Sequence, residues 1–179
     1  DSIYAGISGE YGGIFVTGDD GKNWKRIDSD FKNKEVYQLA FDGDNMYAGT
    51  WYDGIFRSLD RGRTWTPINN GLTNLIINRI LCGDSCLFVG TKYGIFRSTD
   101  NGENWTAAGL NNLEVYGLAF RGDDILAATK YSHGLWISKD NGENWVEMND
   151  GLTFKFCFVI KVLGPNIFLG TWGGGVFIS

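Results

Sequence analysis

Hydrophobic positions along the chain fall into short runs separated by polar turns, and the pattern returns about every 40 residues. Alternation in the second repeat predicts strands over 36–41, 46–50, 55–58 and 64–68. The next two repeats predict strands over 76–81, 87–91, 95–98 and 104–107, then over 115–120, 125–129, 135–138 and 144–148. No segment has the period of a helix. Each full repeat is therefore expected to form a four-stranded antiparallel sheet, with its strands called A to D in chain order.

The two ends of the chain hold shorter versions of the same repeat. The first predicts strands over 3–6, 13–16 and 24–27, which correspond to B, C and D. The last predicts strands over 156–162, 167–171 and 176–179, which correspond to A, B and C. We therefore expect one domain over residues 1–179, with five units at about 1–30, 31–70, 71–110, 111–150 and 151–179.

A turn motif stands between the third and fourth strands of the first four units. It contains Ser98, Asp100, Gly102 and Trp105, and the same spacing returns at 17–24, 58–65 and 138–145. The carboxylate can accept backbone N–H groups while the glycine takes a positive φ, as in a hairpin turn. Calcium binding is the alternative, but a calcium loop needs several carboxylates at alternating positions. Each turn supplies one regular carboxylate, so we expect structural turns and no metal site.

This motif resembles the Asp-box, or BNR, repeat of sialidases, sortilin-type receptors, some xyloglucanases and photosystem assembly factors. The residues that carry the resemblance are Thr17, Asp19, Gly21 and Trp24; Ser58, Asp60, Gly62 and Trp65; Ser98, Asp100, Gly102 and Trp105; and Ser138, Asp140, Gly142 and Trp145. The resemblance implies an all-β propeller built from four-stranded antiparallel blades. Five units predict five blades, and a fragment of a larger propeller is the alternative.

Composition restricts the partners of such a domain. Hydrophobic residues make up 43% of the chain and charged residues 21%, which is typical of a folded protein. The net charge of −5 argues against nucleic acid, which needs a basic surface. No apolar run is long enough to span a membrane, and the chain begins in a predicted strand. We expect no signal peptide in this sequence, as in a mature or trimmed product, and leave open further blades or domains in a longer chain.

Cysteine chemistry gives no clear site. Cys82, Cys86 and Cys157 are odd in number and include no C-x-x-C pair, so no zinc site is expected. Cys82 and Cys86 flank a short turn and could be bridged in an oxidising compartment. Free thiols are the simpler interpretation.

Candidate binding residues gather in the loops between strands B and C. In a propeller these loops lie on one face and the Asp boxes on the other, and loops that vary on a repeated scaffold are where binding usually resides. The variable, aromatic-rich loops hold Glu10, Tyr11, Trp51, Tyr52, Asp53, Lys92, Tyr93, Lys130, Tyr131, Ser132, His133 and Trp172. Their rings could stack on sugars, with charged neighbours supplying hydrogen bonds. The alternative is that the tyrosines only pack over the blade ends.

A catalytic set is not evident. Sialidases of the resembling family need an arginine triad and a tyrosine nucleophile, and the chain lacks the Arg-Ile-Pro motif. Xyloglucanase chemistry uses two carboxylates across a cleft between two propellers. His133 is a lone loop histidine, and Arg57 and Arg97 are expected to be solvated strand residues.

The favoured hypothesis is a secreted or cell-envelope binding or scaffold module, without a cofactor, for a carbohydrate or protein ligand. A glycoside-hydrolase-like fragment, using Asp53 or Glu10, and an amplified repeat scaffold without a ligand are the alternatives. A photosystem-type assembly factor is disfavoured, because it is expected to carry a basic patch.

Overall fold

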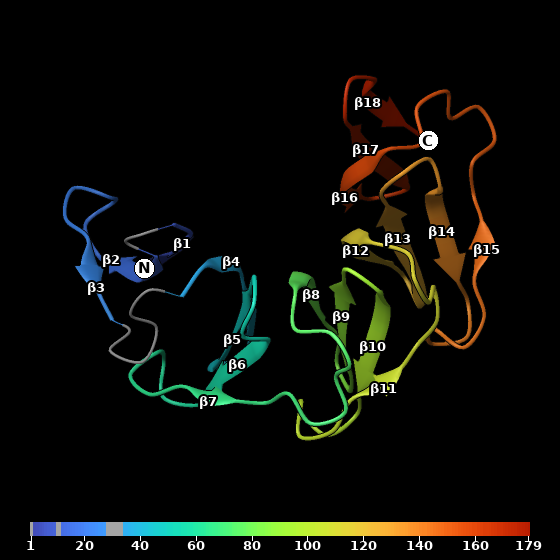
Figure 1. Ribbon diagram of the computed structural model, residues 1–179. Helices are drawn as coiled ribbons and strands as arrows, with labels where there is room; N and C mark the ends of the chain where they lie inside the picture. Colours follow the sequence, from blue (N-terminus) through green and yellow to red (C-terminus); the bar gives the residue numbers. More distant parts are fainter. Residues whose placement is uncertain (1, 10–11, 28–33) are drawn as a thin grey trace.

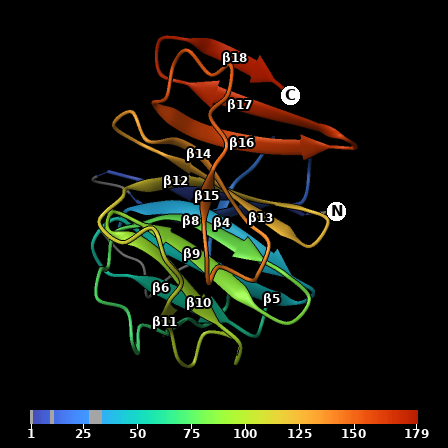
Figure 2. The same cartoon turned by 90° about the vertical axis from the view of Figure 1, so that its right-hand side faces the viewer.

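The computed structural model describes residues 2–9, 12–27 and 34–179, and this part of the chain folds into five antiparallel sheets without a helix. The sheets follow one another along an arc, and the first and last sheets lie at its two ends (Figure 1). From the side, successive sheets stack on one another (Figure 2). The predicted all-β propeller architecture with five blade units is confirmed.

The strand bounds agree closely with the predicted runs. The first blade holds β1 (Ile3–Ile7), β2 (Gly13–Thr17) and β3 (Lys25–Arg26). The second holds β4 (Val36–Asp42), β5 (Asn45–Thr50), β6 (Ile55–Ser58) and β7 (Thr66–Pro67), and the third holds β8 (Ile77–Cys82), β9 (Leu87–Thr91), β10 (Gly94–Ser98) and β11 (Thr106–Ala107). The fourth holds β12 (Val115–Arg121), β13 (Asp124–Thr129), β14 (Gly134–Ser138) and β15 (Val146–Glu147), and the fifth holds β16 (Cys157–Leu163), β17 (Asn166–Thr171) and β18 (Gly175–Ile178).

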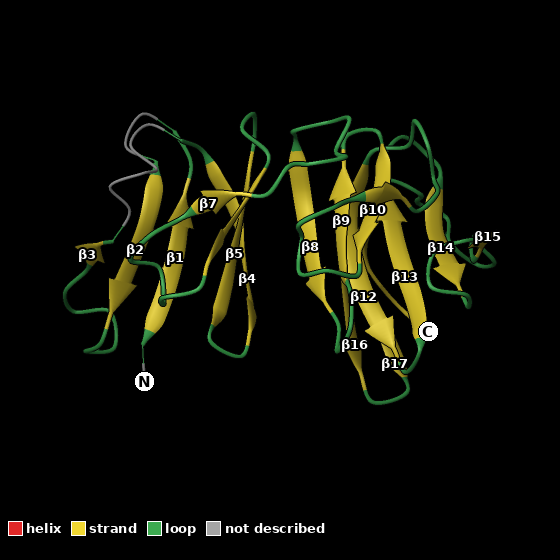
Figure 3. Ribbon diagram, turned by 90° about the horizontal axis from the view of Figure 1, so that it is seen from below, coloured by secondary structure: helices red, strands yellow, loops and turns green. Residues whose placement is uncertain are grey.

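Strand order within every blade follows the chain, so each blade is a meander. The inner strands β4, β8, β12 and β16 face the concave side of the arc, and the short strands β7, β11 and β15 lie on the convex side (Figure 1). The D strands were predicted too long, since only two residues of each pair with strand C. The connecting loops gather at the two ends of the strands, as Figure 3 shows.

The hydrophobic core lies between successive blades rather than within one of them. Tyr47 and Ile68 of the second blade, for example, pack with Ile77 and Val89 of the third, and similar clusters fill the other junctions. Glycine in strand B allows this close approach, because a Cβ at Gly90 would lie 2.9 Å from a methyl carbon of Val115. In a single blade an apolar face of the sheet would be exposed to water, so each blade depends on its neighbours for stability.

The Asp boxes form the tight turns that the sequence predicted. Gly102 has φ of 88° and donates its N–H to the Ser98 hydroxyl, which donates in turn to Asp100. The Asp100 carboxylate also accepts the side-chain and backbone N–H groups of Asn104, at 2.8 and 2.9 Å. These hydrogen bonds, the one from the Asn104 side chain foremost, hold the pKa of Asp100 at about 2. Asp100 therefore acts as the acceptor that closes the turn.

The third and fourth boxes also fasten their blades to the blade before them. The indole of Trp105 is 3% exposed and donates to the carbonyl of Ile68 at 2.7 Å, and Trp145 donates likewise to Ala108 at 2.8 Å. Trp24, in the first box, is 45% exposed. The interpretation of the box tryptophans as packing residues is confirmed for Trp65, Trp105 and Trp145, which pack in the clusters between blades.

Two arginines strengthen these junctions. Arg57 donates to the carbonyl of Asn101 at 2.8 Å and pairs with Glu103 at 2.6 Å, and both partners belong to the next box. Arg97 donates to Asn141 of the following box at 2.9 Å. The expectation that these arginines are merely solvated was therefore wrong, because the arc brings the next box beneath them.

Two tryptophans at the same box position should differ in their contribution to stability. Trp105→Ala is expected to lower the free energy of unfolding by about 3–5 kcal/mol, because it empties a filled junction and leaves a carbonyl without its donor. Trp24→Ala should cost about 1 kcal/mol or less, since this ring is half-exposed. Urea denaturation followed by circular dichroism measures both. Equal losses would contradict the packing described above.

The box carboxylates should make stability depend on acid pH. The folded pKa of Asp100 lies at about 2, below its ordinary value of 3.8, so the carboxylate stabilises the fold above about pH 4. That contribution is lost as the pH falls towards 2. Asp100→Asn should therefore melt below the unmodified chain at pH 6, and the gap in melting temperature should narrow at pH 2.5. A gap that stays constant between these pH values would show that the charge is unimportant.

Candidate functional site

The B-to-C loops stand at one end of the blades, next to the start of the inner strand. Trp51 donates its backbone N–H to the carbonyl of Glu35 at 3.1 Å, and Lys130 makes the same contact with Glu114 at 3.0 Å. Trp172 repeats it with Phe156 at 2.9 Å. The first loop residue of these three blades is thereby fixed beside strand A.

A β-bulge near the start of each inner strand re-aims one side chain. The register shifts between Val36 and Gln38 in β4, and again at the same place in β8, β12 and β16. Bulges commonly redirect side chains near binding sites. The bulged residues of the four blades are Tyr37, Asn78, Tyr116 and Phe158.

The largest group of rings lies across the fourth and fifth blades. We call it the C-terminal aromatic cluster, and it consists of Tyr116, Tyr131, Phe156, Phe158 and Trp172. Phe156 stacks on Tyr131 with centroids 5.7 Å apart, and Phe158 lies 4.8 Å from Tyr116 and 5.5 Å from Trp172. Trp172 is 69% exposed and Tyr131 is 63% exposed. The outer rings of the cluster therefore present a large apolar surface to solvent.

Lys130 is held at the side of this cluster. Its Nζ lies 3.1 Å from the Glu114 carboxylate and 3.4 Å from the Tyr116 hydroxyl, which donates to Glu114 at 3.1 Å. The same ammonium lies 4.7 Å from the centre of the Tyr131 ring. Burial would lower the pKa of Lys130, but its contacts with Tyr131, Glu114 and Tyr116 outweigh burial and raise it. Lys130 therefore remains a cation that braces the rings.

A smaller group of rings occupies the second blade. Tyr37 stacks on Trp51 with centroids 4.6 Å apart, and Tyr52 meets the edge of Trp51 at 6.1 Å. Asp53 pairs with Lys34 at 2.8 Å. Half of the Tyr37 ring and more of Tyr52 face solvent. This blade 2 aromatic cluster is a second exposed surface on the same end of the blades.

The third blade interrupts the aromatic surface. Lys92 lies over the ring of Tyr93 at 5.5 Å, and among the described residues no ring contact joins Tyr93 to either cluster. The bulged residue here is Asn78, whose buried amide has no hydrogen-bond partner within the described chain. The predicted loop residues thus gather in two aromatic groups separated by a more polar blade.

The remaining predicted residues are Glu10, Tyr11, Ser132 and His133. Glu10 and Tyr11 lie outside the described residues. Ser132 and His133 are exposed in the loop between β13 and β14, and Tyr131 and Ser132 both have positive φ, of 57° and 68°. The turn begins at Tyr131, whose ring stacks on Phe156.

Sequence reasoning missed several members of the clusters. Tyr37, Tyr116, Phe156, Phe158 and Glu114 were assigned to strand A or the segment just before it, and were not considered for binding. A signal did exist, because residues 37, 116 and 158 are aromatic at the same position of the repeat. Only the bulge explains why this position can face the loop instead of the sheet.

Other sites were tested on the part of the chain that the structure describes. All three cysteines are free thiols, and burial raises the pKa of Cys82 and Cys157 to about 11. Within residues 2–9, 12–27 and 34–179 no group of three His, Cys, Asp or Glu side chains is arranged to hold a metal. The described residues also contain no helix able to cross a membrane.

Comparison with known proteins supports the repeat assignment. The BNR/Asp-box repeat model matches residues 96–107. No curated protein matches the chain in sequence. The matched segment contains the third box described above, and the other three boxes repeat its hydrogen bonds.

Several solved structures share the fold. The extracellular domain of BT4673 from B. thetaiotaomicron superposes on the whole chain with a TM-score of 0.80 and 21% identity, and 26% of that domain is covered. The Niastella koreensis GH74 enzyme superposes on 99% of the chain with a TM-score of 0.76 and 18% identity, over 33% of the enzyme. YCF48 bound to D1 peptide superposes on 96% of the chain with a TM-score of 0.69 and 15% identity, over 58% of YCF48. The chain thus spans a quarter to about three-fifths of these structures, and at these identities the likeness concerns the fold alone.

Removing the charge partner of Lys130 should destabilise this end of the blades. Glu114→Gln keeps the shape of the side chain but leaves a largely buried ammonium without its counterion, so the free energy of unfolding should fall by about 1–3 kcal/mol. Glu103→Gln is the matched control, since Glu103 is exposed and pairs with Arg57. It should cost about 1 kcal/mol or less. Urea denaturation at neutral pH compares the two, and an equal effect would refute a special role for the buried pair.

Proposed function

We propose that this chain, a BNR/Asp-box repeat protein with propeller blades, is a non-enzymatic binding module whose ligand is a carbohydrate. The observation that carries the proposal is the C-terminal aromatic cluster. Its five rings contact one another, and its two outermost rings are more than half exposed. A monomeric protein rarely leaves such a surface bare without a use for it.

The chemistry of the cluster suits a sugar. The C–H face of a pyranose can lie flat on an indole or phenol ring, and the ring edges carry an N–H or O–H for directional hydrogen bonds. Trp172 and Tyr131 combine both features in exposed positions. Lys130 and Glu114 satisfy each other, so they support the rings and leave recognition to the aromatic faces.

The described carboxylates near the rings support a role without catalysis. Glycoside hydrolysis requires a pair of carboxyl groups that flank the bond to be cleaved. Glu114 is bound to Lys130 and Tyr116, and Asp53 is bound to Lys34. Neither group stands opposite a second carboxylate in the contacts made by the described residues.

A protein ligand is the second candidate. Exposed tyrosine and tryptophan rings are also enriched at protein interfaces. The fold of YCF48 resembles that of this chain, and its solved structure holds a D1 peptide. We place the chain in the extracellular space or cell envelope, by analogy with the extracellular domain of BT4673.

Ligand binding should depend on the two exposed rings. On a glycan array followed by isothermal titration, Trp172→Ala and Tyr131→Ala are each expected to weaken binding by about tenfold or more, because each removes a stacking face. Leu59→Ala, at an exposed position of the second box, is the control and should bind like the unmodified chain.

Three results would contradict the proposal. The first is unchanged glycan binding after both ring substitutions, and the second is binding to no glycan together with binding to a protein. The third is hydrolysis of aryl glycosides that is abolished by changing Asp53 or Glu10, since this would make the chain an enzyme.

A further inference from the structure

The third blade holds polar groups that stacking of a sugar on the aromatic clusters does not use. In the described part of the chain, five buried side-chain nitrogen and oxygen atoms have no hydrogen-bond partner. Three of the five belong to neighbouring residues of β8, namely both amide atoms of Asn78 and Nε of Arg79. Buried polar atoms in proteins are normally satisfied, so their concentration at one place needs an explanation.

Arg79 is a half-buried cation without a counterion. Its guanidinium makes no hydrogen bond or ion pair with any residue that the structure describes. Burial lowers the pKa of Arg79, and no described carboxylate acts against this effect. A guanidinium nevertheless stays protonated in a protein. Of its three nitrogens only Nε is fully buried, so the two terminal nitrogens remain available at the surface.

The second blade uses the same position of the repeat for packing. Gln38 follows the bulge of β4 as Arg79 follows the bulge of β8. The Gln38 amide donates to the carbonyl of Ile80 at 3.1 Å and accepts the N–H of Ile80 at 2.8 Å, so it joins the second blade to the third. Arg79 forms no such bond to the fourth blade. The junction between the third and fourth blades therefore does not require this side chain.

The third blade also differs from its neighbours in the balance of charge at the loop end. Lys34 and Lys130, beside the second and fourth blades, each pair with a carboxylate. Neither Arg79 nor Lys92 of the third blade has such a partner among the described residues. The chain has 21 acidic residues against 16 Lys and Arg, so carboxylates are not in short supply. This end of the third blade thus presents unpaired positive charge between the two aromatic clusters.

We propose that Arg79 binds the carboxylate of a uronic acid residue in the glycan, an inference that rests on the proposed function. A planar carboxylate matches the terminal N–H groups of a guanidinium in a two-fold hydrogen-bonded pair. The blades on either side carry the aromatic clusters, so sugars next to the uronic acid can stack on their rings. Arg79 would then select an acidic glycan over a neutral one.

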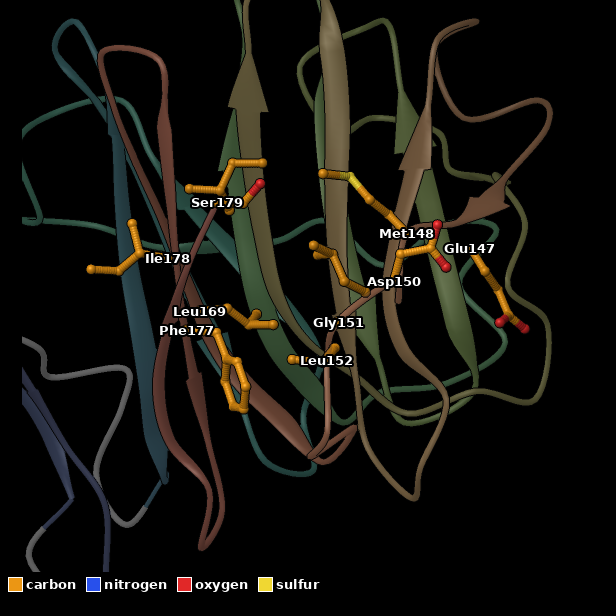
Figure 4. A pocket seen from close by; sticks show the side chains of 11 residues that line it. Glu147, Met148, Asp150, Gly151, Leu152, Leu169, Phe177, Ile178 and Ser179 are labelled. Carbon is orange, nitrogen blue, oxygen red and sulfur yellow. The ribbon is translucent and has the colours of Figure 1, made fainter.

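A groove on the fourth and fifth blades is unsuited to such a ligand. It has a volume of about 480 Å³, and Leu152 and Phe177 are among the residues that line it. Figure 4 shows Glu147 and Asp150 on the side of the groove across from Phe177. These carboxylates disfavour an anion, because like charges repel. Binding of a uronic acid is therefore expected at β8 and not in this groove.

Matched sugars test the selection of charge. Isothermal titration compares the trisaccharides of galacturonic and glucuronic acid with the neutral galactose and glucose trisaccharides of the same linkages. At least one uronic acid trisaccharide should bind about tenfold or more tightly than its neutral counterpart, because it gains hydrogen bonds to a charged group. This preference should weaken as the salt concentration rises, since the terminal nitrogens are at the surface.

Matched variants of the protein locate the site. Arg79→Gln introduces the residue that the second blade carries at this place, so the fold should tolerate it, and no described bond is lost that would lower the melting temperature. The preference for the uronic acid should fall to about twofold or less, with binding of the neutral sugar unchanged. Arg79→Lys keeps the charge without the planar fork and should restore part of the preference. Arg63→Gln, at an exposed position of the second box, is the control and should bind like the unmodified chain.

The inference would be overturned if neither uronic acid were preferred, if the preference survived Arg79→Gln, or if Arg63→Gln removed it as well. Acidic and neutral sugars that bind equally well, and that need Trp172 and Tyr131, would refute the anion site and leave the proposed function standing. Binding of a uronic acid that needs Arg79 but neither ring would support the anion site and refute the proposed role of the aromatic cluster. No binding of any of these sugars would refute both.

Discussion

The structure depends on one recurring contact, in which the tryptophan of an Asp box packs on the blade before it and can donate to a backbone carbonyl there. Trp105 on Ile68 and Trp145 on Ala108 are the best-defined examples. A four-stranded sheet of this size cannot bury both of its faces alone. Because the contact joins blades that are neighbours in the chain, each blade is stabilised by the blades next to it, as in other repeat proteins. In the described chain the exposed fraction of the box tryptophans differs, from 3% for Trp105 to 45% for Trp24.

The box aspartates serve this contact indirectly. Asp100 accepts hydrogen bonds from Ser98 and Asn104, and Gly102 turns the chain so that Trp105 reaches the preceding blade. The carboxylate is itself exposed to solvent, and its low pKa arises from the hydrogen bonds of the turn rather than from burial. Stability of the turn and placement of the indole are thus two consequences of one short motif.

The end of the blades opposite the boxes is built differently. There the scaffold repeats its bulge in the inner strands and its hydrogen bond from the loop, but the side chains vary from blade to blade. Tyr116 and Phe158 extend an aromatic surface, whereas Asn78 breaks it. A rigid, repeated backbone that carries variable side chains can change its ligand without changing its fold. One end of the domain thus repeats the contacts that hold the blades together, and the other carries the variable side chains that we propose for recognition.

The sequence by itself determined the repeat, the strand order and the turn chemistry. These are local properties: alternation in 36–41 or 115–120 reflects one buried face, and the spacing of Asp100 and Gly102 reflects one turn. It also placed Trp51, Lys130, Tyr131 and Trp172 in loops on one face. Connectivity alone is enough for that inference.

Only the tertiary structure decided which of these residues act together. A β-bulge at Tyr116 and at Phe158 interrupts the regular pairing of the inner strand with strand B. The packing of the fourth blade on the fifth then joins these two rings to Tyr131 and Trp172 in one cluster. Lys130, a candidate for ligand contact, also pairs with Glu114, which lies just before strand β12. Arg57 finds its partner in a box more than 40 residues away. Such contacts depend on the angle and distance between blades, which no local pattern in the sequence records.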